Sequence, residues 1–396
     1  MVLVSSKIYC IFEAMKFFPQ SLSDKLSQRE EANALRKLPE PNNRVDFSSN
    51  DYLGFSKSAK IFNDAHAYLL NIGITNNGAT GSRLISGNHS LYNEAEACVS
   101  HFHKAESALI FNSGYDANVG LFSSVLQKGD TILYDEFIHA SIRDGMRLSL
   151  AKAYKFAHND LTDLERLLQK AVTEKSGEIY VVTESVFSMD GDCPDLIAMV
   201  ALTEKYNALL IVDEAHALGV FGNKGEGLVQ ALNLQDKVFA RVMTFGKGLG
   251  CHGAAILGPP QLKEYLVNFA RSFIYTTGLP PHSLSTILTA YAFLQNDTEA
   301  QKALKNNIDF FTSEVERLQL GNFIYSDSAI HCAVVPGNEK VKNIASVLQQ
   351  NGFEVKPILS PTVPQGQERL RFCLHSYTAT TQITHVLELL ATHLSS

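Results

Sequence analysis

The chain has 396 residues, of which 45% are hydrophobic, and a formal net charge of -7. This length and composition predict a globular protein with a large core and two domains. We expect no membrane span, because no continuous apolar stretch is long enough to cross a bilayer. Acidic and basic residues are well mixed, so no basic stripe is available for a nucleic-acid backbone. Small-molecule chemistry is the favoured class of function.

Six cysteines are scattered without a C-x-x-C pair or other metal-ligand spacing. This predicts reduced thiols, a cytoplasmic location and no bound metal. The first residues are mildly apolar, but Lys7, Glu13 and Lys16 interrupt any signal-like core. We interpret the segment before about Ser21 as an N-terminal extension, or Met15 as the true start.

From about residue 105, short apolar strands alternate with amphipathic segments of helical length. This alternation predicts βαβ units and a mostly parallel sheet with helices on both faces. The predicted strands are Ser107–Phe111, Thr131–Tyr134, Ala153–Phe156, Glu178–Thr183, Ala208–Asp213, Arg241–Thr244 and Ala254–Leu257. The predicted helices between them include Leu161–Val172 and Leu196–Tyr206.

After Pro280 and Pro281 the pattern changes, and we predict a smaller α+β domain that closes over the edge of the sheet. Its predicted helices are His282–Leu294, Gln301–Leu318, Val341–Gln350 and Thr381–Leu390, and its predicted strands are His331–Val335 and Arg369–Leu374. The expected organisation is an N-terminal extension and arm over residues 1–60, an α/β domain over 61–285 and a C-terminal α+β domain over 286–396.

Polar residues follow several of the predicted strands. In open parallel sheets, ligands bind beyond the carboxyl ends of the strands. The polar residues at these ends are Ser113, Gly114, Glu184, Asp213, His216 and Lys247. They predict one site along a single edge of the sheet.

Asp213 and Lys247 point to pyridoxal phosphate chemistry. The acid ends an apolar run and would face the cofactor's ring nitrogen, and the lysine, between two glycines, would hold the cofactor's aldehyde as a Schiff base. Each residue alone has an ordinary explanation, as a strand-end turn residue or a solvated loop residue. Their occurrence together, in this order, favours the cofactor.

An ATPase is a second hypothesis, because Leu-Ile-Val-Asp213-Glu214-Ala215-His216 also resembles the acidic box of a helicase. Such an enzyme needs a G-x-x-x-x-G-K-[ST] loop for the phosphates. The Gly-Lys pair at Lys247 follows the acidic box, has Arg241 in place of the first glycine and Gly248 in place of Ser or Thr. The ATPase hypothesis therefore lacks its phosphate loop.

Other candidates fit a cofactor site less specifically. Gly114 and Tyr115 lie between a strand and a helix predicted to begin near Ala117, where free amides attract an anion. His139 follows the next strand and could stack on a ring. Glu184 and Ser188 could position that histidine and the cofactor. Packing, capping and turn formation are the simpler alternatives for each of them.

Several motifs resemble the α-oxoamine synthases, in their order and spacing, from about Ser21 to the C-terminus. They are Asp46–Gly54, Gly81–Gly87, Val186–Asp192, Thr244–Gly248, Ile274–Thr277, Pro361–Pro364 and Arg369–Arg371. The resemblance implies an aspartate-aminotransferase-like, fold type I pyridoxal phosphate enzyme that works as a homodimer with its site at the subunit interface.

The resemblance also implies roles for individual residues. Lys247, Asp213 and His139 would be catalytic, as Schiff-base lysine, pyridinium partner and stacking residue. The cofactor would also contact Gly114, Tyr115, Glu184, Ser188, His216, Thr244, Thr276 and Thr277, the last two across the subunit interface. The substrates would contact Arg36, Asn50, His139, Thr362 and Arg371.

The implied reaction joins L-alanine to a pimeloyl thioester, with loss of CO₂ and the thiol carrier, as in the biotin-synthesis branch of this family. The carrier is left open between coenzyme A and a carrier protein. A sister activity with glycine or serine and another acyl-CoA, such as that of 2-amino-3-ketobutyrate CoA ligase, remains an alternative. An aminotransferase and a non-catalytic descendant are further alternatives.

Overall fold

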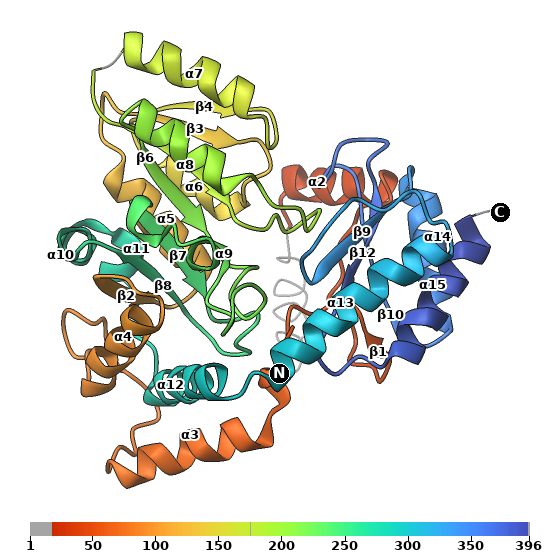
Figure 1. Ribbon diagram of the computed structural model, residues 1–396, viewed down its shortest axis with the longest axis horizontal. Coiled ribbons are helices and arrows are strands. Elements are labelled where there is room, and N and C mark those ends of the chain that lie inside the picture. Colours follow the sequence, from red (N-terminus) through yellow and green to blue (C-terminus); the bar gives the residue numbers. More distant parts are fainter. Residues whose placement is uncertain (1–17, 175, 395–396) are drawn as a thin grey trace, which may run out of the picture.

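The computed structural model describes residues 18–174 and 176–394 (Figure 1). Two bodies lie side by side, a larger one around a seven-stranded sheet and a smaller one formed by the C-terminal part of the chain. The segment before Ser21 that we interpret as an extension, together with Met15, falls almost wholly outside the described residues. Within the described ranges, no helix combines the length and the apolar character that crossing a membrane requires.

The large sheet has the strand order β2-β8-β7-β6-β5-β3-β4. Its strands are β2 (Ser107–Phe111), β3 (Thr131–Asp135), β4 (Lys152–Phe156), β5 (Ile179–Glu184), β6 (Leu209–Asp213), β7 (Ala240–Thr244) and β8 (Ala254–Gly258). All neighbouring strands are parallel except that β8 runs antiparallel to both β2 and β7. The carboxyl ends of β2, β7, β6, β5 and β3 therefore share one edge, as the sequence predicts.

Helices cover both faces of this sheet because successive side chains of each strand point to opposite faces. Val182 and Ile211 belong to an apolar cluster with α5 (Gly114–Val125), α6 (Ala140–Arg147) and α10 (Pro260–Phe269). Their neighbours Val181 and Val212 belong to a cluster with the helices on the other face. The helices of the large body beyond these three are α3 (Ala59–Asn71), α4 (Ser90–Phe102), α7 (Leu161–Thr173), α8 (Leu196–Lys205), α9 (Leu228–Ala231), α11 (Arg271–Ile274) and α12 (Pro281–Asn296).

The smaller body contains an antiparallel sheet of order β11-β12-β9, covered by helices (Figure 1). Its elements are β9 (Ile330–Val334), β11 (Lys356–Ile358), β12 (Arg369–Cys373), α13 (Glu299–Arg317), α14 (Asn338–Gln350) and α15 (Thr380–Leu394). The N-terminal arm carries α2 (Gln20–Glu31) and joins this body, since β1 (Val45–Asp46) pairs in parallel with β10 (Phe353–Glu354).

The seven strands predicted for the large sheet are confirmed, each within one residue at either end. The short strands β1, β10 and β11 were not predicted. One prediction is wrong in detail, because α5 begins at Gly114 rather than near Ala117. The Ser113 side chain accepts a hydrogen bond from the amide of Asp116 at 3.1 Å and so caps the helix earlier.

Candidate active site

A chain of hydrogen bonds leads away from Lys247, in the loop after β7. Lys247 Nζ lies 2.7 Å from His216 Nε2, and His216 Nδ1 lies 2.6 Å from the hydroxyl of Tyr52. Loss of hydration lowers the pKa of Lys247 to about 8 against the attraction of Asp213 and Glu184. Burial and the nearby Lys247 hold the pKa of His216 well below its usual value, so its imidazole is neutral.

Two carboxylates end adjacent strands of the sheet. The register of β5 and β6 pairs Glu184 with Asp213, and both are buried. Asp213 accepts hydrogen bonds from Asn118 Nδ2 at 2.8 Å and from the Ala215 amide at 2.9 Å. Burial, reinforced by repulsion from Asp213, raises the pKa of Glu184 well above its usual value. Glu184 is thus a carboxyl group that holds its proton more readily than usual.

His139 begins α6 at the same edge. Its backbone amide donates to Glu184 Oε1 at 2.5 Å, and its Nδ1 lies 2.7 Å from Ser141 Oγ. Burial and Lys247 lower the pKa of His139, whereas Asp213 opposes the shift. The ring is therefore neutral, which suits stacking against a flat partner. The Glu184 carboxyl group thus contacts the backbone of this histidine at the strand end.

Arg371, in β12, reaches the site from the smaller body. Its Nε donates to the backbone oxygen of Ser188 at 2.8 Å, and its Nη2 donates to Asn50 Oδ1 at 3.0 Å. Asn50 also accepts from the Tyr52 hydroxyl at 3.2 Å. The arm thus links Arg371 to the hydrogen-bond chain that ends at Lys247.

At the start of α5, the backbone of Gly114 lies close to the side chain of Thr244. A Cβ on Gly114 would lie 2.5 Å from Thr244 Oγ1, so no larger residue fits without displacement. Asn112 Nδ2 donates to Thr276 Oγ1 at 3.1 Å and to the Thr277 carbonyl at 2.7 Å, which brings that segment beside the same turn. The free amides of the first helical turn, with the Thr244 hydroxyl beside them, are suited to binding an anion.

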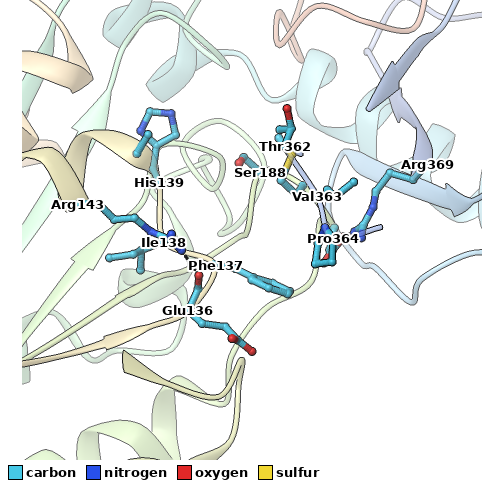
Figure 2. Close-up of a pocket in the computed structure, with 13 residues that line it drawn as sticks. Glu136, Phe137, Ile138, His139, Arg143, Ser188, Thr362, Val363, Pro364 and Arg369 are labelled. Carbon is cyan, nitrogen blue, oxygen red and sulfur yellow. Dashed lines mark hydrogen bonds and ion pairs between the residues drawn. The ribbon is translucent and has the colours of Figure 1, made fainter. Parts of the chain in front are cut away.

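The remaining predicted residues occupy different positions. Thr362 lines a cavity of about 330 Å³ together with His139 and Ser188 (Figure 2). Tyr115 is half exposed, and its hydroxyl donates to Asp144 Oδ2 at 2.9 Å. Arg36 is exposed in the segment between α2 and β1, and no contact recorded for the described residues joins it to the site.

Sequence analysis missed Tyr52 and Asn118 as supporting residues. Tyr52 lies inside the motif Asp46–Gly54, but nothing in the sequence indicates that its hydroxyl contacts His216. It also missed a polar cluster behind the site, where His158 lies between Asp135 Oδ1 at 2.9 Å and Asp192 Oδ2 at 2.8 Å. The Phe137 ring stacks on His158 with centroids 4.3 Å apart. This cluster ties the loops after β3 and β5 together.

Ligand atoms of His158, Asp190 and Asp192 lie within 4.8 Å of one another, a spacing that a metal ion could use. Their charges are matched within the protein. Asp190 forms an ion pair with Arg369, and His158 bridges Asp135 and Asp192. That no metal ion binds therefore stays a prediction from the sequence.

The donor set fits pyridoxal phosphate. Asp213 is a buried carboxyl group whose two hydrogen bonds come from neutral donors, so it has the chemistry to pair with a protonated ring nitrogen. Lys247 has the lowered pKa that an amine needs to react with an aldehyde. The Gly114 turn, into which a Cβ would not fit, offers amides to the phosphate.

Comparison with known proteins agrees with this geometry. The family described as aminotransferase class I and II matches residues 42–390. An 8-amino-7-oxononanoate synthase from Emericella nidulans is 40% identical and aligns over 96% of this chain and 97% of its own length. A putative 8-amino-7-oxononanoate synthase from Bacillus cereus (strain Q1) is also 40% identical, over 88% of this chain and 86% of its own length.

Solved structures agree as well. A serine palmitoyltransferase variant from S. paucimobilis, solved with bound PLP, matches with a TM-score of 0.85 at 26% identity, over 94% of this chain and 96% of the other. An 8-amino-7-oxononanoate synthase from Francisella tularensis matches with a TM-score of 0.76 at 29% identity, over 90% of this chain and 99% of the other.

The fold and the site thus define a fold type I enzyme that depends on pyridoxal phosphate. Within that class the chain belongs to the α-oxoamine synthases, the acyltransferase group that the resemblance of its motifs implies.

Proposed function

We propose that this enzyme condenses L-alanine with a pimeloyl thioester to give 8-amino-7-oxononanoate, CO₂ and the free thiol carrier, as a step of biotin synthesis. The relatives named for this activity support the choice of substrates. The observation that carries the chemistry is the line of contacts from Lys247 through His216 and Tyr52 to Asn50 and Arg371. This line of contacts connects Lys247, the proposed base, with Asn50 and Arg371, which we propose bind the carboxylate of the amino acid.

Bound pyridoxal phosphate supplies an electron sink for the pair left on the amino acid's α-carbon. Lys247 would hold the cofactor and, once displaced by the amino acid, would take the α-proton on Nζ. Its pKa of about 8 leaves part of the amine neutral near pH 7, as a general base requires. Asp213 would keep the ring nitrogen protonated, and His139 would stack on the ring.

Arg371 and Asn50 would receive the amino acid's carboxylate. The guanidinium has donors left after its bond to Ser188, and it lies close enough to Asn50 for both to act on one group. Thr362, across the cavity from His139, would contact the acyl substrate (Figure 2). Ser188, His216 and Thr244 would contact the cofactor, with Gly114 and Tyr115 beside its phosphate.

We also propose that the enzyme is a cytoplasmic homodimer in which Thr276 or Thr277 reaches the neighbouring subunit's phosphate. Five cysteines in the described part of the chain are free thiols, which suits a reducing compartment. Arg36, exposed in the arm, would take its substrate-binding role only at the assembled interface.

The test is a matrix of amino acids and thioesters with purified holoenzyme. L-alanine, glycine and L-serine are each combined with pimeloyl-CoA and with shorter and longer acyl-CoAs, and free thiol and product mass are measured. We expect thiol release and 8-amino-7-oxononanoate with alanine and pimeloyl-CoA. Faster thiol release with glycine or serine and another thioester would establish the sister activity. Amino-group transfer to a keto acid without thiol release would make the protein an aminotransferase.

A further inference from the structure

The cavity beside the site has a mostly apolar lining that also includes charged groups. Its apolar wall consists of Phe137, Ile138, Met189, Val363 and Pro364. Glu136, Asp190, Arg143 and Arg369 add two acids and two cations. Figure 2 shows His139 and Arg143 on one side, with Thr362, Pro364 and Arg369 on the other.

Three of these four charges are already engaged within the protein. Arg369 forms an ion pair with Asp190 and donates from Nε to the Gln367 carbonyl at 2.9 Å. Glu136 lies 3.4 Å from Lys155 Nζ and accepts from the His158 amide at 3.3 Å. Arg143 is the remaining cation, and among the described residues no carboxylate forms an ion pair with it.

Arg143 has donors to spare. It lies in α6 four residues after His139, the residue that caps this helix, and both residues line the cavity. Its Nη2 donates to the backbone oxygen of Glu136, and its Nε is buried without a hydrogen-bond partner. A guanidinium has five N–H donors, so most of its capacity is unused.

We propose that Arg143 binds the terminal carboxylate of a dicarboxylic acyl chain in this cavity and thereby selects ω-carboxylated thioesters over simple fatty acyl thioesters. The inference rests on the proposed function, because it names the residue that recognises the far end of the acyl substrate. A planar guanidinium matches a carboxylate with two parallel hydrogen bonds. The apolar wall between Thr362 and Phe137 suits the methylene chain.

The size of the cavity favours the acyl chain over its carrier. Its volume of about 330 Å³ lies at the small end of the range for ligand pockets, about 300–1,000 Å³. A short acyl chain suits a pocket of this size better than the much larger coenzyme A. The phosphates of the carrier would therefore stay outside, and the anion that meets Arg143 would be the chain's own carboxylate.

The test compares two thioesters that differ only at the far end of the chain. Pimeloyl-CoA and heptanoyl-CoA have the same number of carbons, but heptanoyl-CoA ends in a methyl group. For wild-type holoenzyme and the variant Arg143→Met, kcat and KM are measured with alanine and each thioester. We expect the variant to lose about 10- to 100-fold in kcat/KM with pimeloyl-CoA, mainly through KM, because a charge-assisted pair is lost. Heptanoyl-CoA should be affected less than about twofold.

Two further variants complete the design. Arg147→Met removes a cation one turn further along α6, where the side chain is 78% exposed, and should leave both thioesters unaffected. Arg143→Lys keeps a positive charge but loses the planar fork, so its loss with pimeloyl-CoA should be intermediate. An equal loss with both thioesters in Arg143→Met, or no loss with pimeloyl-CoA, would overturn the proposal.

Binding measurements separate this proposal from the proposed reaction and do not depend on the variants. Calorimetric titration of wild-type holoenzyme with pimelate and with heptanoate should show tighter binding of pimelate by at least about tenfold. Equal affinities would overturn the role of Arg143 even if pimeloyl-CoA is consumed. Selective, Arg143-dependent binding of pimelate without thiol release would support the carboxylate site and reject the reaction.

Discussion

On the large-body side of the active site, Asp213 and Glu184 end adjacent strands whose register fixes their spacing, and Lys247 lies in the loop that follows the next strand. On the small-body side, Arg371 depends on contacts with Asn50 of the arm and Ser188 of a loop. The first set is held by one rigid sheet, whereas the second depends on how three parts of the chain meet. We therefore expect changes on the sheet side to act on kcat and changes on the other side to act on KM.

The largest effect should come from Lys247→Ala. We expect turnover to fall by at least about 10⁴-fold, because the variant lacks both the amine that holds the cofactor and the base. Thiol release and the visible absorbance of the cofactor are measured together. Lys224→Ala, in an exposed loop, is the matched control. Activity retained in Lys247→Ala would show that Lys247 neither holds the cofactor nor acts as the base.

The second-largest effect should come from Arg371→Met, which tests whether the small-body side acts on KM rather than on kcat. We expect the KM for alanine to rise about 100-fold while kcat falls much less, since a partner of the carboxylate is lost. The KM for the thioester should stay within about threefold, which serves as the internal control. A loss confined to kcat would mean that both sides act on the same step.

His158 gives a prediction about stability. Burial lowers its pKa, but the flanking Asp135 and Asp192 outweigh this effect and raise the pKa to about 9. A raised histidine pKa stabilises the folded state below the unfolded value of about 6.5, and the stabilisation is lost as pH rises through about 9. The free energy of unfolding in urea should therefore decline over this range.

The matched variant is His158→Gln. It should be less stable by about 3 kcal/mol at pH 6, because the buried Asp135 and the partly buried Asp192 lose their cation. Its stability should also depend less on pH between about 6.5 and 9. An unchanged pH profile in the variant would show that another group is responsible for the decline.

The smallest effect is expected from Tyr52→Phe. It removes one hydroxyl that bonds both His216 and Asn50, and each of these two hydrogen bonds contributes about 1 kcal/mol. We expect kcat/KM for alanine to fall about 10- to 30-fold. A loss as large as that of Arg371→Met would show that binding of alanine depends on the arm as much as on Arg371.

The sequence predicted the sheet side of the site better than the other side. The strands are runs of apolar residues with polar residues at their ends, so both the strands and the shared edge could be inferred from local pattern. Glu184 and Asp213 were found in this way. Arg371, Asn50 and Thr362 came instead from the resemblance of motifs, because nothing local indicates that they approach the sheet.

The supporting residues were missed for a physical reason. Tyr52 and His216 are 164 residues apart, and Asn118 and Asp213 are 95 apart. Such pairs are set by the packing of whole elements and have no periodic signature. The strands β1 and β10 could not be predicted either, because each has only two residues. Alternation of apolar and polar residues is recognised only over a longer run. The charge of His158 likewise depends on partners from two other loops.

The hydrogen bonds around Asn50 have a direction. When Lys247 donates to Nε2 of the neutral His216, Nδ1 carries the ring proton and donates to Tyr52, whose hydroxyl then donates to Asn50 Oδ1. Arg371 donates to the same oxygen. A single amide oxygen of the arm thus connects the lysine on the large-body side with the arginine on the small-body side.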